Sequence, residues 1–364
     1  MTHLNTILDL YGFNEIQQEG LLDALKIVDC NIQVDESISS VEALDIFNEE
    51  LQKSFLRPQG SERQQLSDKF ENEREHLLPL LAPFIEEINT GNNVAHKILL
   101  GASESGVRER LNILVKLNNN TQVVYPLGGQ RDLWPIAEPS TEKLVAQRLS
   151  IPKEEVANTF QLIFAKSIEM QNNRQNYTDV EFTEETNKAR KESIEYFTGL
   201  GITWPTETDM MANLIEEYQI KLPGIEFKDV INAEKKLNAA GKLVRPDTLD
   251  TLIKMREIYE GQIPTQIAIV TTQPFGHYQQ QQVIKAFNGL SIEILVVAEG
   301  ANSAKVNLST VFDSLARTIY AGKDIVVEKL KMREAEAKIA PVKKSFVERY
   351  LEEALVPKAT SQEL

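Results

Sequence analysis

An apolar run in the second half of the chain opens directly onto polar residues. In "IAIVTTQPFGHYQQQQV", residues 267–283, the apolar part is followed by Thr271, Thr272, Gln273 and His277. Histidine is the side chain whose ordinary pKa best suits proton transfer near neutral pH. The pattern predicts a ligand site at which His277 is a general acid or base; the alternative is a hydrogen-bonded loop histidine. The glutamines that follow would face all sides of a helix turn, so we expect most of them to be solvated.

A second apolar run ends in glycine and small polar residues. In "LLGASESGVRER", Gly101 and Ser103 stand where the amide groups of a helix start could hold an anion, and Arg108 lies about one turn further on. The glycine lets the backbone approach a ligand closely. The alternatives are a turn glycine and a surface ion pair between Arg108 and a neighbouring glutamate.

A third run, "YPLGGQRDLWP", ends in the pair Gly128 and Gly129 and is followed by Arg131. An arginine fork suits a carboxylate or a phosphate, because it can donate two parallel hydrogen bonds. These residues predict a second contribution to the same anion site, with turn formation as the alternative role of both glycines.

Acidic residues occur at two helix starts. In "TWPTETDMMANL" we expect Thr206 to cap a helix, which makes Glu207 a candidate proton carrier. In "VRPDTLDTL", Asp247 and Thr248 are candidate ligand contacts or simple caps.

These residues share a position relative to the predicted strands. From about residue 96 short apolar runs alternate with helical stretches, which is typical of a parallel α/β sheet. Ligands of such sheets bind outside the carboxyl ends of the strands, so residues that follow the strands should converge. We therefore predict a Rossmann-like sheet flanked by helices, with strands in the runs "HKILLGA", "TQVVYPLGG", "FKDVINA", "TQIAIVTTQ" and "SIEILVVAEG".

The remaining segments are predicted to be helical. Residues 1–94 form an N-terminal helical region, in which Ser39 and Glu42 have the spacing of a capping box. The α/β domain is predicted to cover residues 95–330 with a helical insertion at about 138–205, and residues 331–364 to form a last helix and tail. The N-terminal region is the candidate surface for a protein partner.

Composition narrows the class of protein. The net charge of −15 disfavours nonspecific binding to nucleic acid or to anionic membranes, and Cys30 is the only cysteine among 364 residues, as expected in a reducing compartment. No stretch approaches a membrane span, so a soluble, cytoplasmic protein is expected. Dinucleotide, P-loop, hydrolase-elbow and zinc-protease motifs are not found in their standard forms, and the four histidines lack metal-ligand spacing, so no metal site is expected.

In order, "LLGASESGVRERL", "YPLGGQRDLWP", "TETDMMANL", "RPDTLDTL" and "IVTTQPFGHYQ" resemble the segments of the YdcF-like (SanA/ElyC-like) family of bacterial Rossmann-like domains. The likeness extends over residues 96–300 and is strongest to uncharacterised cytoplasmic members. Two departures stand out: His277 comes about two residues later than the family's histidine, and the family's glutamate could match Glu142 or Glu207. We prefer Glu207 because Thr206 supplies a cap.

The resemblance implies a small anionic or nucleotide-like ligand, such as S-adenosylmethionine or a nucleotide. That ligand would lie near Gly101, Arg108, Gly129, Arg131, Thr272 and His277, in a binding protein, a transferase or a hydrolase. The alternative hypothesis is a protein-interaction module that uses the added helices around an inert α/β core.

Overall fold

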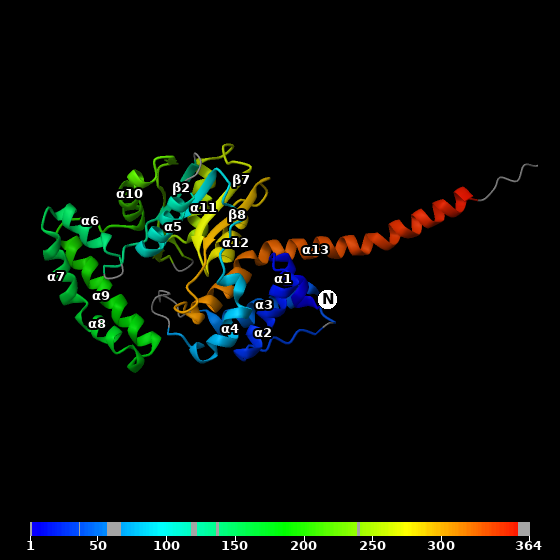
Figure 1. The fold of residues 1–364 in the computed structure, drawn as a ribbon, viewed down its shortest axis with the longest axis horizontal. Coiled ribbons are helices and arrows are strands. Elements are labelled where there is room, and N and C mark those ends of the chain that lie inside the picture. The colour runs from blue at the N-terminus through cyan, green and yellow to red at the C-terminus, as the bar shows by residue number, and fades with distance from the viewer. Residues whose placement is uncertain are drawn as a thin grey trace, which may run out of the picture.

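The computed structural model describes residues 2–35, 37–56, 67–117, 122–135, 138–238 and 241–355, with side chains described to residue 336. At its centre lies a parallel sheet with the strand order β3-β2-β1-β7-β8 (Figure 1). Its strands are β1 (His96–Leu100), β2 (Gln122–Gly129), β3 (Ile225–Phe227), β7 (Gln266–Thr272) and β8 (Glu293–Glu299), and β4 (Ile231–Ala233) also pairs with β2. A separate antiparallel pair joins β5 (Lys236–Leu237) to β6 (Leu243–Val244).

The predicted α/β class is confirmed, and each of the five apolar runs contains a strand. The run "FKDVINA" differs from the prediction in that its ends belong to two short strands, β3 and β4, which pair with successive parts of β2. The strand order reverses at β1. The chain first adds β2 on one side of β1 and later adds β7 on the other side. Ligand crevices of open α/β sheets form at such a reversal.

Helices cover both faces of the sheet. On one face, α5 (Glu104–Lys116) and α10 (Glu207–Tyr218) bury Leu111 and Met210 against the strands. On the other, α11 (Thr248–Ile258) and α12 (Gly276–Ala286) bury Leu252 and Val283. All four helices fall in stretches predicted to be helical.

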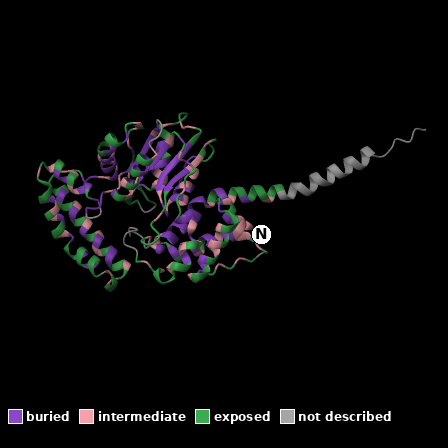
Figure 2. Ribbon diagram, in the orientation of Figure 1, coloured by how far each residue is buried: buried purple, intermediate pink, exposed green. Residues whose placement is uncertain are grey.

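A third hydrophobic cluster joins the two ends of the chain. It is formed by α13 (Leu308–Leu355) with α1 (His3–Leu10), α2 (Glu15–Ile27), α3 (Ser40–Phe55) and α4 (Arg74–Leu80). The capping box of Ser39 and Glu42 is present at the start of α3. Because α13 runs without a break through residue 330, the boundary predicted there is not an element boundary. Its buried first part lies beside the N-terminal helices, and the helix then extends away from them (Figures 1 and 2).

The predicted insertion contains α6 (Ser140–Leu149), α7 (Lys153–Ile163), α8 (Ala165–Asn172) and α9 (Asp179–Gly199). Single turns of 3₁₀ helix occur at Glu71–Glu73, Ala82–Phe84, Arg174–Asn176 and Gln219–Lys221. The chain enters and leaves the insertion at one place, where Asp132 and Thr206 form an antiparallel bridge. The backbone N–H of Glu207 donates to the Arg131 carbonyl there, at 2.9 Å. We call this crossing, residues 131–133 with 205–207, the neck.

His277 lies at the junction between the sheet domain and the N-terminal helices. Its ring packs against Phe13 and Phe84, with ring centroids 4.9 and 5.3 Å away. Gln273 serves the same junction, because its amide donates to the carbonyls of Pro83 and Glu86 at 2.9 and 2.8 Å. Both residues therefore join two parts of the fold, and the predicted roles of His277 in proton transfer and of Gln273 in ligand binding are corrected accordingly.

The glutamines of α12 also differ from the prediction. Gln279, Gln281 and Gln282 are buried, because α12 packs against β8, α11 and α13 and leaves little of its surface to solvent. Gln280 is half-buried and donates to the Ile294 carbonyl at 3.2 Å. In the part of the chain that the structure describes, no helix is long and apolar enough to cross a membrane.

The half-buried His277 ring predicts a pH dependence of stability. Burial lowers the pKa of His277 to about 4, while a hydrogen bond with the Pro83 backbone opposes the shift. Between pH 6.5 and 4 the unfolded chain takes up a proton that the folded chain does not, so stability should fall with pH by up to about 3 kcal/mol. Urea unfolding from pH 7 to 4 should show a smaller loss for His277→Gln than for the wild type.

His76→Gln, which removes an exposed histidine, controls for the substitution itself. Parallel pH profiles for the wild type and His277→Gln would show that His277 takes up its proton equally well in the folded protein.

Candidate functional site

A pocket of about 780 Å³ lies at the carboxyl ends of the central strands. Leu100 at the end of β1, Leu127 in β2 and Thr272 at the end of β7 contribute to its wall. The turn from β1 into α5 and the starts of α11 and α12 supply further parts. The pocket therefore occupies the reversal point of the sheet, where the predicted residues were expected to converge.

The added helices complete the pocket. Ser167 and Asn172 of α8 and Phe182 of α9 line it, together with Arg317 of α13. The insertion is thus part of the candidate site, a role that the sequence did not indicate, since its one candidate residue, Glu142, lies outside the pocket.

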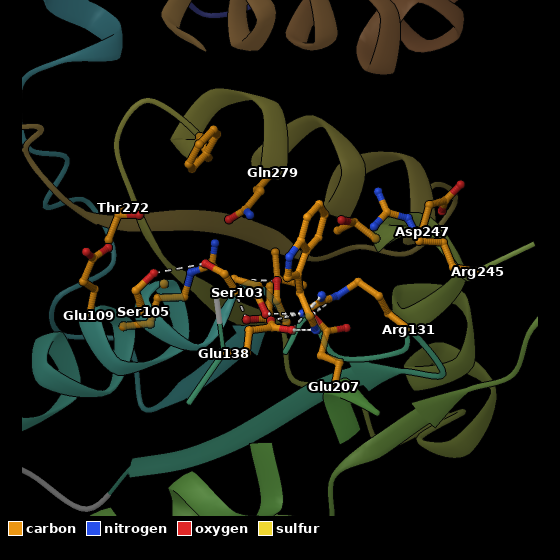
Figure 3. A pocket seen from close by; sticks show the side chains of 18 of the residues that line it. Ser103, Ser105, Glu109, Arg131, Glu138, Glu207, Arg245, Asp247, Thr272 and Gln279 are labelled. Atoms are coloured by element: carbon orange, nitrogen blue, oxygen red, sulfur yellow. Dashed lines mark hydrogen bonds and ion pairs between the residues drawn. The ribbon is translucent and has the colours of Figure 1, made fainter. Parts of the chain in front are cut away.

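The structure brings together about half of the predicted residues. Those that line the pocket are Gly101, Ser103, Arg131, Glu207, Asp247, Thr248 and Thr272. Glu142, the other candidate for the family's glutamate, pairs with Lys153 outside the pocket, which favours Glu207. Figure 3 shows Glu207 and Arg131 side by side, with Asp247 beyond them.

Arg131 is held by two carboxylates at the floor of the pocket. Its guanidinium lies 2.6 Å from Glu138 and 3.5 Å from Glu207, and all three side chains are largely buried. The same guanidinium donates to the Ala102 carbonyl at 2.9 Å, and Glu138 also accepts from the Trp134 backbone N–H. Arg131 therefore lies in the predicted site, but as one member of an ionic cluster with Glu138 and Glu207.

Glu207 has the environment of a proton-carrying group. Burial raises the pKa of its carboxyl group, and the Glu138 charge raises it further, while Arg131 acts in the opposite direction. Glu109, on the wall near Thr272 in Figure 3, also has a pKa raised by burial. A carboxyl group with a raised pKa can hold a proton nearer neutral pH and can release it to a ligand.

The glycine at the end of β1 makes room for this carboxyl group. A Cβ atom on Gly101 would lie 2.6 Å from the Glu207 carboxyl carbon, closer than two carbon atoms can approach. Close packing also requires glycine at position 128, because a Cβ atom there would lie 2.9 Å from the Thr208 hydroxyl. Gly128 and Gly129 are not among the residues that line the pocket, and Gly129 packs against Pro246. Their predicted ligand contacts are corrected to close packing of β2 against its neighbours.

Arg108 and Thr271 also lie outside the pocket. The Arg108 guanidinium forms ion pairs with Glu104 at 2.9 Å and with Glu217 at 2.7 Å, which joins α5 to α10. Thr271 lies inside β7, one residue before the strand end, and its side chain is fully buried. The structure thus supports the surface-pair alternative for Arg108, and Thr272 is the threonine that reaches the pocket.

Arg110, two residues after Arg108, lines the pocket instead. Its guanidinium is buried and donates to the carbonyls of Leu100 and Gly101, which fixes the end of β1. Helical geometry could have indicated it, since residues 108 and 110 lie on different sides of a helix. A second missed signal is the spacing of Gly101, Ser103 and Gly106, a GxGxxG spacing with serine at the second glycine.

Two buried polar atoms at the pocket have no hydrogen-bond partner among the described residues. They are the Oε1 atom of Gln279 on α12 and the hydroxyl of Ser167 on α8. Figure 3 shows the Gln279 side chain directed from α12 toward the turn that carries Ser103. Among the described residues no group of three or more histidine, cysteine or acidic side chains could hold a metal ion.

Comparison of the chain with protein-family models, with curated proteins and with solved structures found no match.

The ionic cluster predicts that loss of Arg131 lowers the stability of the protein more than loss of Arg333, which pairs at an exposed site. Arg131→Met should destabilise the protein by about 3 kcal/mol in urea unfolding, because it leaves the buried Glu138 without its cation. The double variant Arg131→Met/Glu138→Gln should lose less than the single variant, because the stranded charge is then absent.

Arg333→Met is the matched control, because Arg333 pairs with Asp9 at a largely exposed site, and it should cost less than about 1 kcal/mol. Equal losses for Arg131→Met and Arg333→Met would contradict the proposed weight of the buried cluster.

Proposed function

We propose that the pocket binds a small anionic or nucleotide-like ligand, such as a nucleotide or S-adenosylmethionine. The observation that carries the proposal is a pocket of about 780 Å³ at the sheet reversal into which the start of α5 opens. This volume falls within the usual range for small-molecule sites, about 300–1,000 Å³.

The anionic end of the ligand is assigned to the start of α5. Ser103 is the N-cap residue and makes no side-chain capping bond, while Ser105 and Gly106 in the first turn line the pocket. The first N–H groups of a helix have no partner within the helix and carry its positive dipole end. Glu104 does not oppose an anion here, because its carboxylate accepts from the Ser140 backbone N–H and pairs with Arg108.

Arginine side chains add positive charge around the same space. Arg131, Arg245 and Arg317 line the pocket, and Arg317 also binds Asp313 at 2.9 Å. Carboxylates balance part of this charge, so recognition of the anion is assigned to the helix start together with these guanidinium groups rather than to one arginine.

Aromatic side chains favour a ligand with a planar part. Four aromatic residues from three segments line the pocket: Trp134 after β2, Phe182 of α9, and Phe275 and Tyr278 at the start of α12. Aromatic and apolar walls with a few directed polar groups are typical of sites for cofactors and nucleotides.

Any proton transfer in this pocket is assigned to Glu207. It lines the pocket with a raised pKa, whereas His277 packs between Phe13 and Phe84 at the junction. We also propose that the five segments similar to the YdcF-like family reflect the same kind of ligand. A transferase or hydrolase reaction would then use Glu207 as its acid or base.

Thermal unfolding with a panel of adenosine and uridine nucleotides, S-adenosylmethionine, nucleotide sugars and sugar phosphates, with and without Mg²⁺, tests the proposal. A ligand at a hundred times its dissociation constant should stabilise the wild type by about 2.7 kcal/mol. Ser105→Glu should abolish the shift, because it places a negative charge at the assigned anion site.

Ser105→Gln is the matched control, since it adds a neutral side chain of the same length at this exposed position, and it should keep most of the shift. The proposal fails if no compound on the panel stabilises the wild type, or if Ser105→Glu responds to the ligand as the wild type does.

A further inference from the structure

The two buried polar atoms at the pocket, Gln279 Oε1 and the Ser167 hydroxyl, should destabilise the unliganded protein. Burying a hydroxyl or amide oxygen without a hydrogen bond costs about 1–3 kcal/mol, and such groups are rare in folded proteins. Gln279 and Ser167 are both more than nine-tenths buried, and both line the same pocket from different elements, α12 and α8. Six other described side chains hold such an atom away from this pocket, so what distinguishes Gln279 and Ser167 is that they line one pocket from two elements, where a ligand can supply the missing hydrogen bonds.

The chemistry of the two atoms restricts what can satisfy them. An amide oxygen only accepts hydrogen bonds, and a serine hydroxyl can accept or donate. An ionised phosphate or carboxylate has no hydrogen to donate, so the anionic end of a ligand cannot satisfy the oxygen of Gln279. A hydroxyl group can satisfy both residues.

Other residues that line the pocket also carry uncharged hydrogen-bonding side chains. Gln171 and Asn172 of α8, Thr186 of α9 and Thr251 of α11 also line the pocket, and all of them carry neutral hydrogen-bonding groups. The charged side of the pocket is different, with Arg131, Glu138 and Glu207 grouped on its floor (Figure 3).

We propose that Gln279 and Ser167 recognise the hydroxyl groups of a sugar or ribose carried by the anionic ligand. This inference rests on the proposed function and extends it to the ligand class, a phosphorylated polyol such as a ribonucleotide or a sugar phosphate. The helical insertion then takes part in recognition, because Ser167 belongs to it, and ligand affinity depends on the insertion as well as on the sheet domain.

Isothermal titration of the whole chain with two matched pairs of compounds tests the inference. The pairs are ATP with 2′,3′-dideoxyATP, and glucose 6-phosphate with methyl phosphate. At least one parent compound should bind the wild type, and its hydroxyl-poor partner should bind at least about tenfold more weakly, because the pocket atoms then stay without partners.

Substitutions at the two residues should remove this preference. Gln279→Met and Ser167→Ala should each raise the dissociation constant of the bound parent about tenfold and reduce the difference between the two members of its pair. Neither variant should lower the unfolding temperature of the unliganded protein, because each removes a buried polar atom that has no partner among the described residues.

Two control variants make the same chemical changes outside the pocket. Gln282→Met replaces another buried glutamine of α12, and Thr183→Val removes a buried hydroxyl of α9 that lacks a partner among the described residues. Both lie outside the pocket lining, so both should bind the parent compound as the wild type does.

The experiments distinguish a failure of this inference from a failure of the proposed function. Equal binding of a parent and its hydroxyl-poor partner overturns this inference and leaves the proposed anion site standing. Unchanged affinity in both Gln279→Met and Ser167→Ala also overturns it, as does a lack of binding by all four compounds; the wider panel then decides separately whether the proposed function stands.

Discussion

The buried contact between Arg131, Glu138 and Glu207 is the interaction on which the candidate site depends. Arg131 follows β2, Glu138 leads into the insertion, and Glu207 opens α10, so the cluster joins three segments at the neck. Buried charges cost several kcal/mol each unless they are paired, which strongly favours the one arrangement in which all three meet. The backbone bridge of Asp132 with Thr206 closes the same neck.

This arrangement explains how the α/β sheet accommodates an insertion of about seventy residues. Because the inserted chain enters and leaves through paired backbone, the sheet needs no adjustment beyond the neck. The insertion has its own small core, in which Phe160 and Phe197 pack with Trp204. Its orientation over the sheet is set by the neck together with the packing of α6 on α10, where Arg148 pairs with Asp209 at 2.8 Å, and this orientation brings α8 and α9 to the pocket.

The sheet could be predicted from the sequence because its signals are local. Apolar runs of strand length that end in glycine or small polar residues located the strands, and Thr206 and Asp247 located two helix starts. The site was predicted only in part, since a strand end indicates a region and not a direction. Arg108 and Arg110 are two residues apart, yet one pairs with Glu217 and the other faces the pocket.

Residues that depend on distant packing could not be predicted in this way. His277 and Gln273 follow a strand, as ligand contacts do, but the N-terminal helices occupy the space beside them through Phe13, Phe84 and the Pro83 carbonyl. The burial of Gln281 and Gln282 has the same cause, because α13 packs on α12. No local sequence pattern predicts that residues far away along the chain, in the N-terminal helices and in α13, cover α12.

The pocket wall begins at Leu100 and ends at Arg317, and it includes the sheet, the insertion and the helix that joins the N-terminal cluster. A ligand there would touch every major packing unit of the chain at once. Its binding energy would therefore be shared among units that otherwise have separate hydrophobic cores, and partial unfolding of any one of them would release the ligand. Occupancy of the pocket would make unfolding of the protein more cooperative, and a fragment that lacks any of these units would lack a complete pocket.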